Sequence, residues 1–234
     1  MALFNTPITA TKTLRVLARL LAYPDAELRG NLSELRQALH EERALPALRL
    51  AELDALIDQL VRPASLDTEA AYVELFDRGR ATSLHLFEHV HGDSRERGPA
   101  MIDLAQTYET AGLYLAEDEM PDFLPVVLEF TSTQPPREAR EFLSEMGHIF
   151  NAIFAALQQR DSAYAAVLGA LLELAGEKAQ AVTIAAEEPI DAVWQEPVVF
   201  DGCSTKGQAK PGQAQPIHIV RKPPASQRPE GSQA

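Results

Sequence analysis

The sequence predicts an all-α protein. Leu and Ala dominate, Gly accounts for only 12 of 234 residues, and aromatic residues make up 6%, a balance that favours helices over sheet. Apolar residues recur at helical spacing, and no strand-like alternation interrupts them before the tail. We therefore expect a single-domain helical bundle of roughly eight or nine helices with a disordered C-terminal tail.

Four helices are expected in the first third of the chain. Thr11 or Thr13 is a candidate cap for the first, and Asp25 for the second. Prolines at positions 24 and 63 end the first and third, because the residue before proline avoids helical dihedrals. The expected ranges are about 13–22, 25–39, 46–61 and 65–79.

Five further helical segments follow. Pro135-Pro136 is the strongest break in this part of the chain, and the longest helix is expected after it. Gly112 falls inside an apolar stripe, where it would permit close helix approach. The expected ranges are about 83–90, 99–115, 121–130, 136–157 and 162–172.

Charge separates the body of the chain from its end. The formal net charge is −13, but residues 201–234 hold five Lys and Arg against two acidic residues, which leaves −16 for residues 1–200. So acidic a body argues against nucleic acid and favours a basic peptide as partner. Residues 1–196 are expected to form the folded domain. Residues 197–234, rich in Gly, Pro, Gln and Lys, are expected to be a disordered tail.

Several classes of protein are excluded at this stage. Cys203, in the tail, is the single cysteine, so no internal disulfide and no cysteine metal cluster can form. No signal-peptide pattern begins the chain, and no apolar run approaches the ~18 residues of a membrane helix. We expect a cytoplasmic protein without membrane insertion, either a monomer or a weak homodimer.

The stretch from Tyr72 to Met101 is the most distinctive. His85, Glu88 and His89 match the H-x-x-E-H pattern, in which two histidines hold zinc and the glutamate acts as general base. A zinc metallopeptidase is therefore one hypothesis, although it needs a third ligand from another helix. The alternative is a polar helix face whose histidines pair with nearby carboxylates.

Two pairs of arginines bracket glycines in the same stretch. Arg78 and Arg80 flank Gly79, and Arg95 and Arg97 precede Gly98. Guanidinium groups suit carboxylate and phosphate oxygens. These arginines therefore either tie turns to acidic helices or contact a small anion.

The stretch resembles the signature of a known family. The residues that carry it are Leu-Phe-Asp-Arg-Gly-Arg-x-Thr-Ser-Leu-His-Leu-Phe-Glu-His-Val-His-Gly-x-Ser-Arg-x-Arg-Gly-x-Ala-Met, over 75–101, with Leu20-Leu-x-Tyr-Pro-Asp25 and Pro121-Asp-Phe-Leu-Pro-x-x-Leu-Glu-Phe130 on either side. Together they are similar to the NarJ-type chaperones, also called the respiratory nitrate reductase delta subunit family. The resemblance extends over roughly Leu14 to Phe200.

The resemblance implies a function without catalysis. Such chaperones bind the N-terminal segment of the nitrate reductase catalytic (alpha) subunit, keep the apoenzyme competent for insertion of the molybdenum–guanine dinucleotide cofactor, and restrain membrane docking. By this resemblance the chain itself holds no cofactor stably and no metal, and its client carries the molybdenum cofactor. A structural subunit retained in a redox complex is a further alternative.

An acidic groove between helices would suit a basic amphipathic leader. In related redox-enzyme chaperones an acidic-Pro-Asp-His motif forms a hinge, and Phe123 stands here in place of that histidine. The candidates for client contact are Tyr72, Phe76, His85, Phe87, Glu88, His89, Glu119, Asp122 and Phe123.

Overall fold

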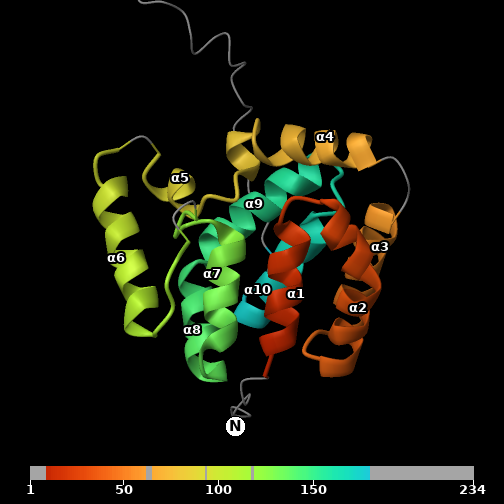
Figure 1. Ribbon diagram of the computed structural model, residues 1–234, viewed down its shortest axis with the longest axis horizontal. Helices are drawn as coiled ribbons and strands as arrows, with labels where there is room; N and C mark the ends of the chain where they lie inside the picture. Colours follow the sequence, from red (N-terminus) through yellow and green to blue (C-terminus); the bar gives the residue numbers. More distant parts are fainter. Residues whose placement is uncertain (1–8, 62–64, 93, 117–118, 180–234) are drawn as a thin grey trace, which may run out of the picture. The chain divides into compact units, whose positions relative to one another are not determined.

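The computed structural model describes residues 9–61, 65–92, 94–116 and 119–179, which lie in one compact unit (Figure 1). The all-α class is confirmed over these residues, and the expectations for residues 197–234 and Cys203 fall outside them. The helices are α1 (Thr11–Leu21), α2 (Ala26–Glu42), α3 (Ala47–Val61), α4 (Ser65–Phe76), a 3-10 turn (Arg80–Thr82), α5 (Leu86–Val90), α6 (Arg97–Thr110), α7 (Leu124–Thr133), α8 (Pro136–Glu145), α9 (Gly147–Gln159) and α10 (Ala165–Ala175).

Helices α1 and α10 form the centre of the core. Seven of the eleven residues of α1 and eight of the eleven of α10 are buried. Helix α1 packs against α7 and α2, and α10 packs against α9, α8 and α3. Figure 1 shows the α2–α3 hairpin on one side of α1 and α4 across one end. This centre is the rigid part of the protein, because its apolar stripes are fully removed from water.

The cap of α1 comes from a distant residue. The backbone N–H groups of Lys12 and Thr13 donate to the Glu42 carboxylate at 3.0 and 2.6 Å. Neither Thr11 nor Thr13 caps the helix, so that expectation was wrong. The end of α2 supplies a negative charge at the positive end of α1. The predicted cap of α2 is confirmed, because the N–H of Leu28 donates to Asp25 at 2.7 Å.

The expected helix over 136–157 is two helices. Met146, at φ −91° and ψ 0°, ends α8 and precedes α9. The break lets α8 bury Ala139 and Leu143 beside α7 and α10. Beyond it, α9 turns Phe150 and Ile153 toward α10. Periodicity continues across such a break, so the sequence pattern alone did not reveal it.

Gly112 ends a helix instead of lying inside one. It adopts a left-handed φ of +80°, and the N–H of Leu113 donates to the carbonyl of Tyr108 at 2.9 Å. This arrangement is the common glycine-based termination of an α-helix. The chain after α6 is therefore a loop that carries Leu113, Tyr114 and Leu115.

The stretch after α4 is not a pair of regular helices. Helix α4 ends at Phe76, before Gly79, and the backbone is extended at His85 with φ −86° and ψ 103°. Leu84 and Leu86 are buried while His85 lies on the other side, which is the alternation of an extended chain. The backbone of this extended segment forms hydrogen bonds with residues 122–124, as described below, instead of the i→i−4 hydrogen bonds of a helix.

Helix α6 is the least buried long helix of the described part. Of its fourteen residues only Tyr108 is buried, and Figure 1 shows it at one edge of the unit. The Tyr108 hydroxyl donates to the carbonyl of Pro121 at 2.8 Å, and its ring lies 4.6 Å from that of Phe130. One aromatic anchor thus holds much of α6 to the bundle.

Among the described residues, no helix is both long enough and apolar enough to cross a membrane.

The cap supplied by Glu42 makes a prediction for stability. Replacing Glu42 by alanine is expected to lower the free energy of unfolding by about 1 kcal/mol, because two N–H groups of α1 lose their acceptor. Urea denaturation measures the change. The matched control is Glu41→Ala, which removes an exposed ion pair with Lys12 and an exposed hydrogen bond from Gln37 and should change stability by less than about 0.5 kcal/mol. Equal effects of the two substitutions would show that Glu42 is no cap.

Candidate functional site

Two segments far apart in the sequence cross beside α7. The N–H of Leu86 donates to the carbonyl of Asp122 at 3.0 Å, and the N–H of Leu124 donates to the carbonyl of Leu84 at 2.9 Å. His85 and Phe123 thereby form an isolated antiparallel bridge. The crossing brings the histidine-rich stretch against the Pro-Asp-Phe segment that the family resemblance singled out.

The carboxylate of Asp122 is the centre of this crossing. Its side chain is 0% exposed. One oxygen accepts from the N–H of Phe87 at 3.1 Å, and the other lies 3.3 Å from Nδ1 of His85. A guanidinium nitrogen of Arg97 lies 3.8 Å away. A buried carboxylate is stable only when it is paired in this way, so Asp122 holds three segments together and is not open to a client.

His85 and Phe123 form the outer side of the crossing. Their rings lie 5.3 Å apart, and the His85 side chain keeps about a third of its surface exposed. The hydrogen bond to Asp122 raises the pKa of His85, helped by the charges of Asp122 and Glu88 and opposed by burial and by Arg97. His85 therefore binds a proton more readily than a free histidine does, and part of its ring remains accessible to solvent.

The residues of the zinc pattern make separate contacts. Glu88 pairs with Arg97 at 3.5 Å, and Nε2 of His89 lies 2.9 Å from the carbonyl of Ser83. His85 caps no helix through its side chain and pairs with Asp122. Within the described residues no three His, Cys, Asp or Glu side chains are grouped so that they could hold a metal ion. The third ligand that the peptidase hypothesis requires is not supplied there.

Tyr72 and Phe76 lie in the core beneath α4. Each is 5% exposed, and their rings pack together with those of Tyr23 and Tyr164. The Tyr72 hydroxyl donates to the carbonyl of Leu21 at 2.6 Å, and burial raises its pKa. A direct contact between these two residues and a client stays a prediction, and it would require α4 to move.

The four motif arginines differ in their surroundings. Arg97 joins Glu88 and Asp122, and Arg78 pairs with Glu74 one turn earlier on α4 at 2.9 Å. Arg80 and Arg95 have exposed side chains. Arg97 is thus part of the crossing, whereas Arg78 forms an ordinary surface pair that contributes little to stability.

Glu119 lies apart from the crossing, in a groove of about 430 Å³. The groove runs between the end of α6, the loop after it, α7 and one residue of α1. Its floor and walls are largely apolar, and two carboxylates lie at its rim. The lining residues are Arg15, Tyr108, Leu113, Tyr114, Leu115, Glu119, Val126, Glu129, Phe130 and Thr133.

Sequence reasoning missed most of this groove. Tyr114 is 80% exposed, an unusual position for a large aromatic ring. Residues 113–115 fall within the helix expected over about 99–115, whereas they form a loop after the left-handed Gly112. A short apolar run directly after a glycine was the available signal. The structure therefore separates the candidate residues into three places: the core under α4, the Asp122 crossing and this groove.

The fold is similar to that of a protein of known structure. A crystal structure described as a putative redox enzyme maturation protein from Archaeoglobus fulgidus matches with a TM-score of 0.51, over 76% of this chain and 100% of that chain. The two sequences are 18% identical, so this likeness concerns the fold alone.

Sequence comparison identifies the family. The model of the family described as "Nitrate reductase delta subunit" matches residues 22–168. The nitrate reductase molybdenum cofactor assembly chaperone NarJ of Escherichia coli K12 is 42% identical over 193 residues, which cover 78% of this chain and 82% of NarJ. A probable NarJ of Bacillus subtilis is 33% identical over 163 residues, covering 68% of this chain and 86% of that protein. The chain belongs to the nitrate reductase delta subunit family, as the motif resemblance predicted.

The Asp122–His85 pair makes a prediction for pH dependence. Asp122→Asn should lower the pKa of His85, because the carboxylate is the main cause of its elevation. With a raised folded pKa, the pair stabilises the fold fully below about pH 6.5, and this contribution is lost as pH rises through the folded pKa. The stability deficit of Asp122→Asn should therefore shrink as pH rises. NMR titration of the imidazole and urea denaturation across pH measure both quantities.

Glu88→Gln is the matched control for this pair. Glu88 affects His85 only through its charge, so its removal should shift the pKa of His85 less than Asp122→Asn does. An unchanged His85 titration in Asp122→Asn would contradict the pairing.

Proposed function

We propose that this chain is a cytoplasmic assembly chaperone of respiratory nitrate reductase. The observation that carries the proposal is the 42% identity with a nitrate reductase molybdenum cofactor assembly chaperone, over 82% of that protein's length. On this proposal the chain binds the catalytic subunit through its N-terminal segment. It keeps the apoenzyme competent for insertion of the molybdenum–guanine dinucleotide cofactor and delays membrane docking.

The groove that contains Glu119 is the site that best suits such a client. An amphipathic segment needs an apolar surface for its buried face and opposite charge at the rim. The groove offers the rings of Tyr108 and Phe130 below and the carboxylates of Glu119 and Glu129 above. The net charge of −16 over residues 1–200 favours encounter with a basic leader.

The weak attachment of α6 supports entry of a helix-sized client. Met101 and Leu104 precede Tyr108 at helical spacing, yet both stay partly exposed. A client helix lying beside them would bury apolar surface that the chain leaves open, at about 25 cal/mol per Å². Movement of α6 would have to break the contacts of Tyr108 near its end and the ion pairs of Arg97 at its start.

On this proposal the Asp122 crossing holds one end of the groove in place. Asp122 receives backbone and side-chain donors and is unavailable to a client, whereas His85 and Phe123 remain reachable. Pro121 links the two places, because its carbonyl accepts the Tyr108 hydroxyl one residue before Asp122. We infer that the crossing positions the groove wall.

A synthetic peptide copying the N-terminal segment of the nitrate reductase catalytic subunit of the same organism tests the proposal. Fluorescence anisotropy with the full-length chain should give a Kd on the order of micromolar or tighter. Added salt should weaken the complex, because carboxylates at the rim contribute to encounter and register. Tyr114→Ala should raise Kd about tenfold, because it removes an exposed aromatic anchor. Glu129→Gln should raise Kd about threefold.

Two substitutions away from the groove are matched controls. Leu66 on α4 is 76% exposed, and Glu145 on α8 is an exposed carboxylate. Leu66→Ala and Glu145→Gln should leave Kd within about twofold of the wild type. If the groove variants and the control variants weaken peptide binding equally, the groove is not the binding site. If the wild type does not bind the peptide at all, the N-terminal segment is not the client segment.

A further inference from the structure

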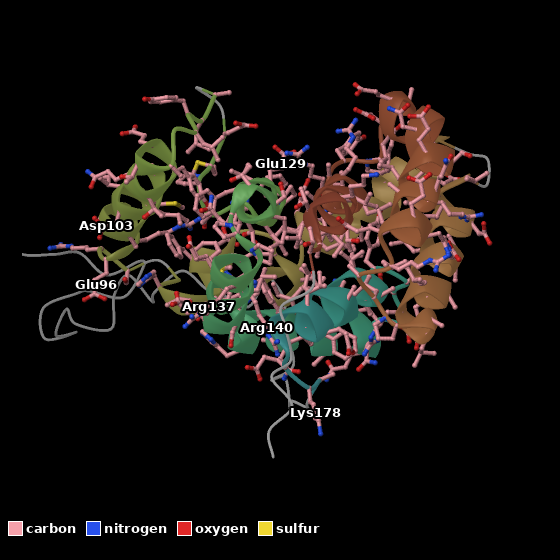
Figure 2. All side chains as sticks on the ribbon, turned by 90° about the horizontal axis from the view of Figure 1, so that it is seen from below. Glu96, Asp103, Glu129, Arg137, Arg140 and Lys178 are labelled. Carbon is pink, nitrogen blue, oxygen red and sulfur yellow. The ribbon has the colours of Figure 1, made fainter. Side chains whose placement is uncertain are left out.

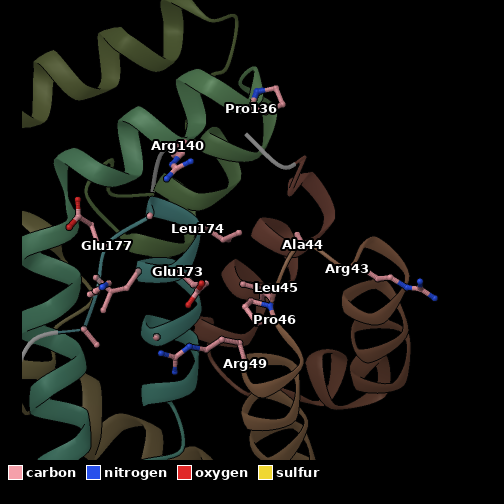
Figure 3. A pocket seen from close by; sticks show the side chains of 15 residues that line it. Arg43, Ala44, Leu45, Pro46, Arg49, Pro136, Arg140, Glu173, Leu174 and Glu177 are labelled. Atoms are coloured by element: carbon pink, nitrogen blue, oxygen red, sulfur yellow. The ribbon is translucent and has the colours of Figure 1, made fainter. Parts of the chain in front are cut away.

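A second hollow lies on another part of the helical unit. Its volume is about 770 Å³, within the range of small-molecule sites. It is bounded by the α2–α3 connection, the start of α8 and the end of α10 (Figure 3). None of its lining residues belongs to the client groove or to the Asp122 crossing. The four cations that line it are Arg43, Arg49, Arg140 and Lys178.

Two of these guanidinium groups lie against glycine residues, one within α10 and one directly after it. A Cβ at Gly169 would lie 2.7 Å from a terminal nitrogen of Arg49, and a Cβ at Gly176 would overlap the guanidinium of Arg140. Gly169 lies within α10, and Gly176, at a left-handed φ of +79°, directly follows its last residue. The absence of a side chain at both positions lets one guanidinium group approach the body of the helix and another its C-terminal end.

The positive groups are only partly neutralised. Arg49 pairs with Glu52 at 2.6 Å, which occupies one of its five N–H donors. Among the described residues no carboxylate forms an ion pair with Arg140 or Lys178. Figure 2 shows Arg140 and Lys178 on the opposite side of the unit from Glu129 of the client groove. Arg49, Arg140 and Lys178 thus lie around one hollow of an otherwise acidic body.

Two carboxylates also line the hollow. Figure 3 shows Glu173 between Arg140 and Arg49, with Arg43 pointing away from them. Glu177 accepts a hydrogen bond from Ser144 at 3.2 Å, which directs it toward the end of α8. Glu173 is therefore the negative group inside the hollow, where it opposes an anion but can accept from a donor on the same ligand.

We propose that this hollow binds a phosphate-bearing small molecule. Its phosphate oxygens would contact the guanidinium group of Arg140 on one side of Glu173 and that of Arg49 on the other, with the ammonium of Lys178 as a further donor, because guanidinium forks match phosphate geometry. Glu173 would accept a hydrogen bond from an amine or hydroxyl elsewhere on the ligand. The client groove is separate, so this site is independent of the peptide-binding proposal.

Inorganic pyrophosphate is the probe, titrated calorimetrically into the full-length chain at low salt. The wild type should bind with a Kd on the order of 1 mM or tighter. Arg140→Gln should raise Kd about tenfold, because it removes a charged donor. Glu173→Gln should lower Kd about threefold, because it removes a repulsive charge. Gly169→Ala, which favours the helix but displaces the Arg49 guanidinium, should raise Kd even where Arg140→Gln folds poorly.

Arg137→Gln is the matched control. Arg137 lies one turn before Arg140 on α8, pairs with Glu141 at 2.9 Å, and does not line the hollow. Its replacement should leave Kd within about twofold. No heat with wild-type protein up to about 10 mM pyrophosphate would overturn the proposal. If Arg137→Gln and Arg140→Gln weaken binding equally, the effect is one of general charge and the proposed site is wrong. If citrate binds as tightly as pyrophosphate, the hollow is not specific for phosphate.

Discussion

The buried carboxylate of Asp122 is the interaction on which the functional half of the structure depends. It joins the start of α5, the imidazole of His85 and the guanidinium of Arg97. Those groups come from the extended residue before α5, from α5 itself and from the first residue of α6, which share few other contacts. Removal of the charge would leave donors without an acceptor in a place closed to water, which costs more than the loss of one exposed hydrogen bond.

Around this point the protein combines a rigid centre with a lightly held edge. Helices α1 and α10 bury most of their residues, whereas α6 buries only Tyr108. Regions with few buried apolar contacts open at low free-energy cost. Such an edge suits a protein that must receive a foreign segment and later release it, because binding and release then leave the core undisturbed.

Local patterns predicted most helices because they depend on neighbours within a few residues. The Asp25 cap and the proline breaks before α2 and α8 are confirmed, and the leucine stripe of α1 is buried as expected. The failures share one cause. Glu42 caps α1 from thirty residues away, Met146 breaks a continuous stripe, and residues 84–86 pair with residues 122–124, so the helix expected over 83–90 begins only at Leu86. Each depends on contacts between distant segments, which periodicity does not encode.

By itself the sequence determined the all-helical class, the acidic character of the body and the family, because composition, spacing and a long motif are properties of the linear chain. Only the tertiary structure decided which motif residues are accessible. Tyr72, Phe76 and Asp122 belong to the interior, while an open groove is lined by Tyr114, which is absent from the motif, and by Glu129, which the motif contains but which was not a candidate for client contact. The reason is physical: exposure depends on which helix faces meet, and packing between distant segments selects those faces.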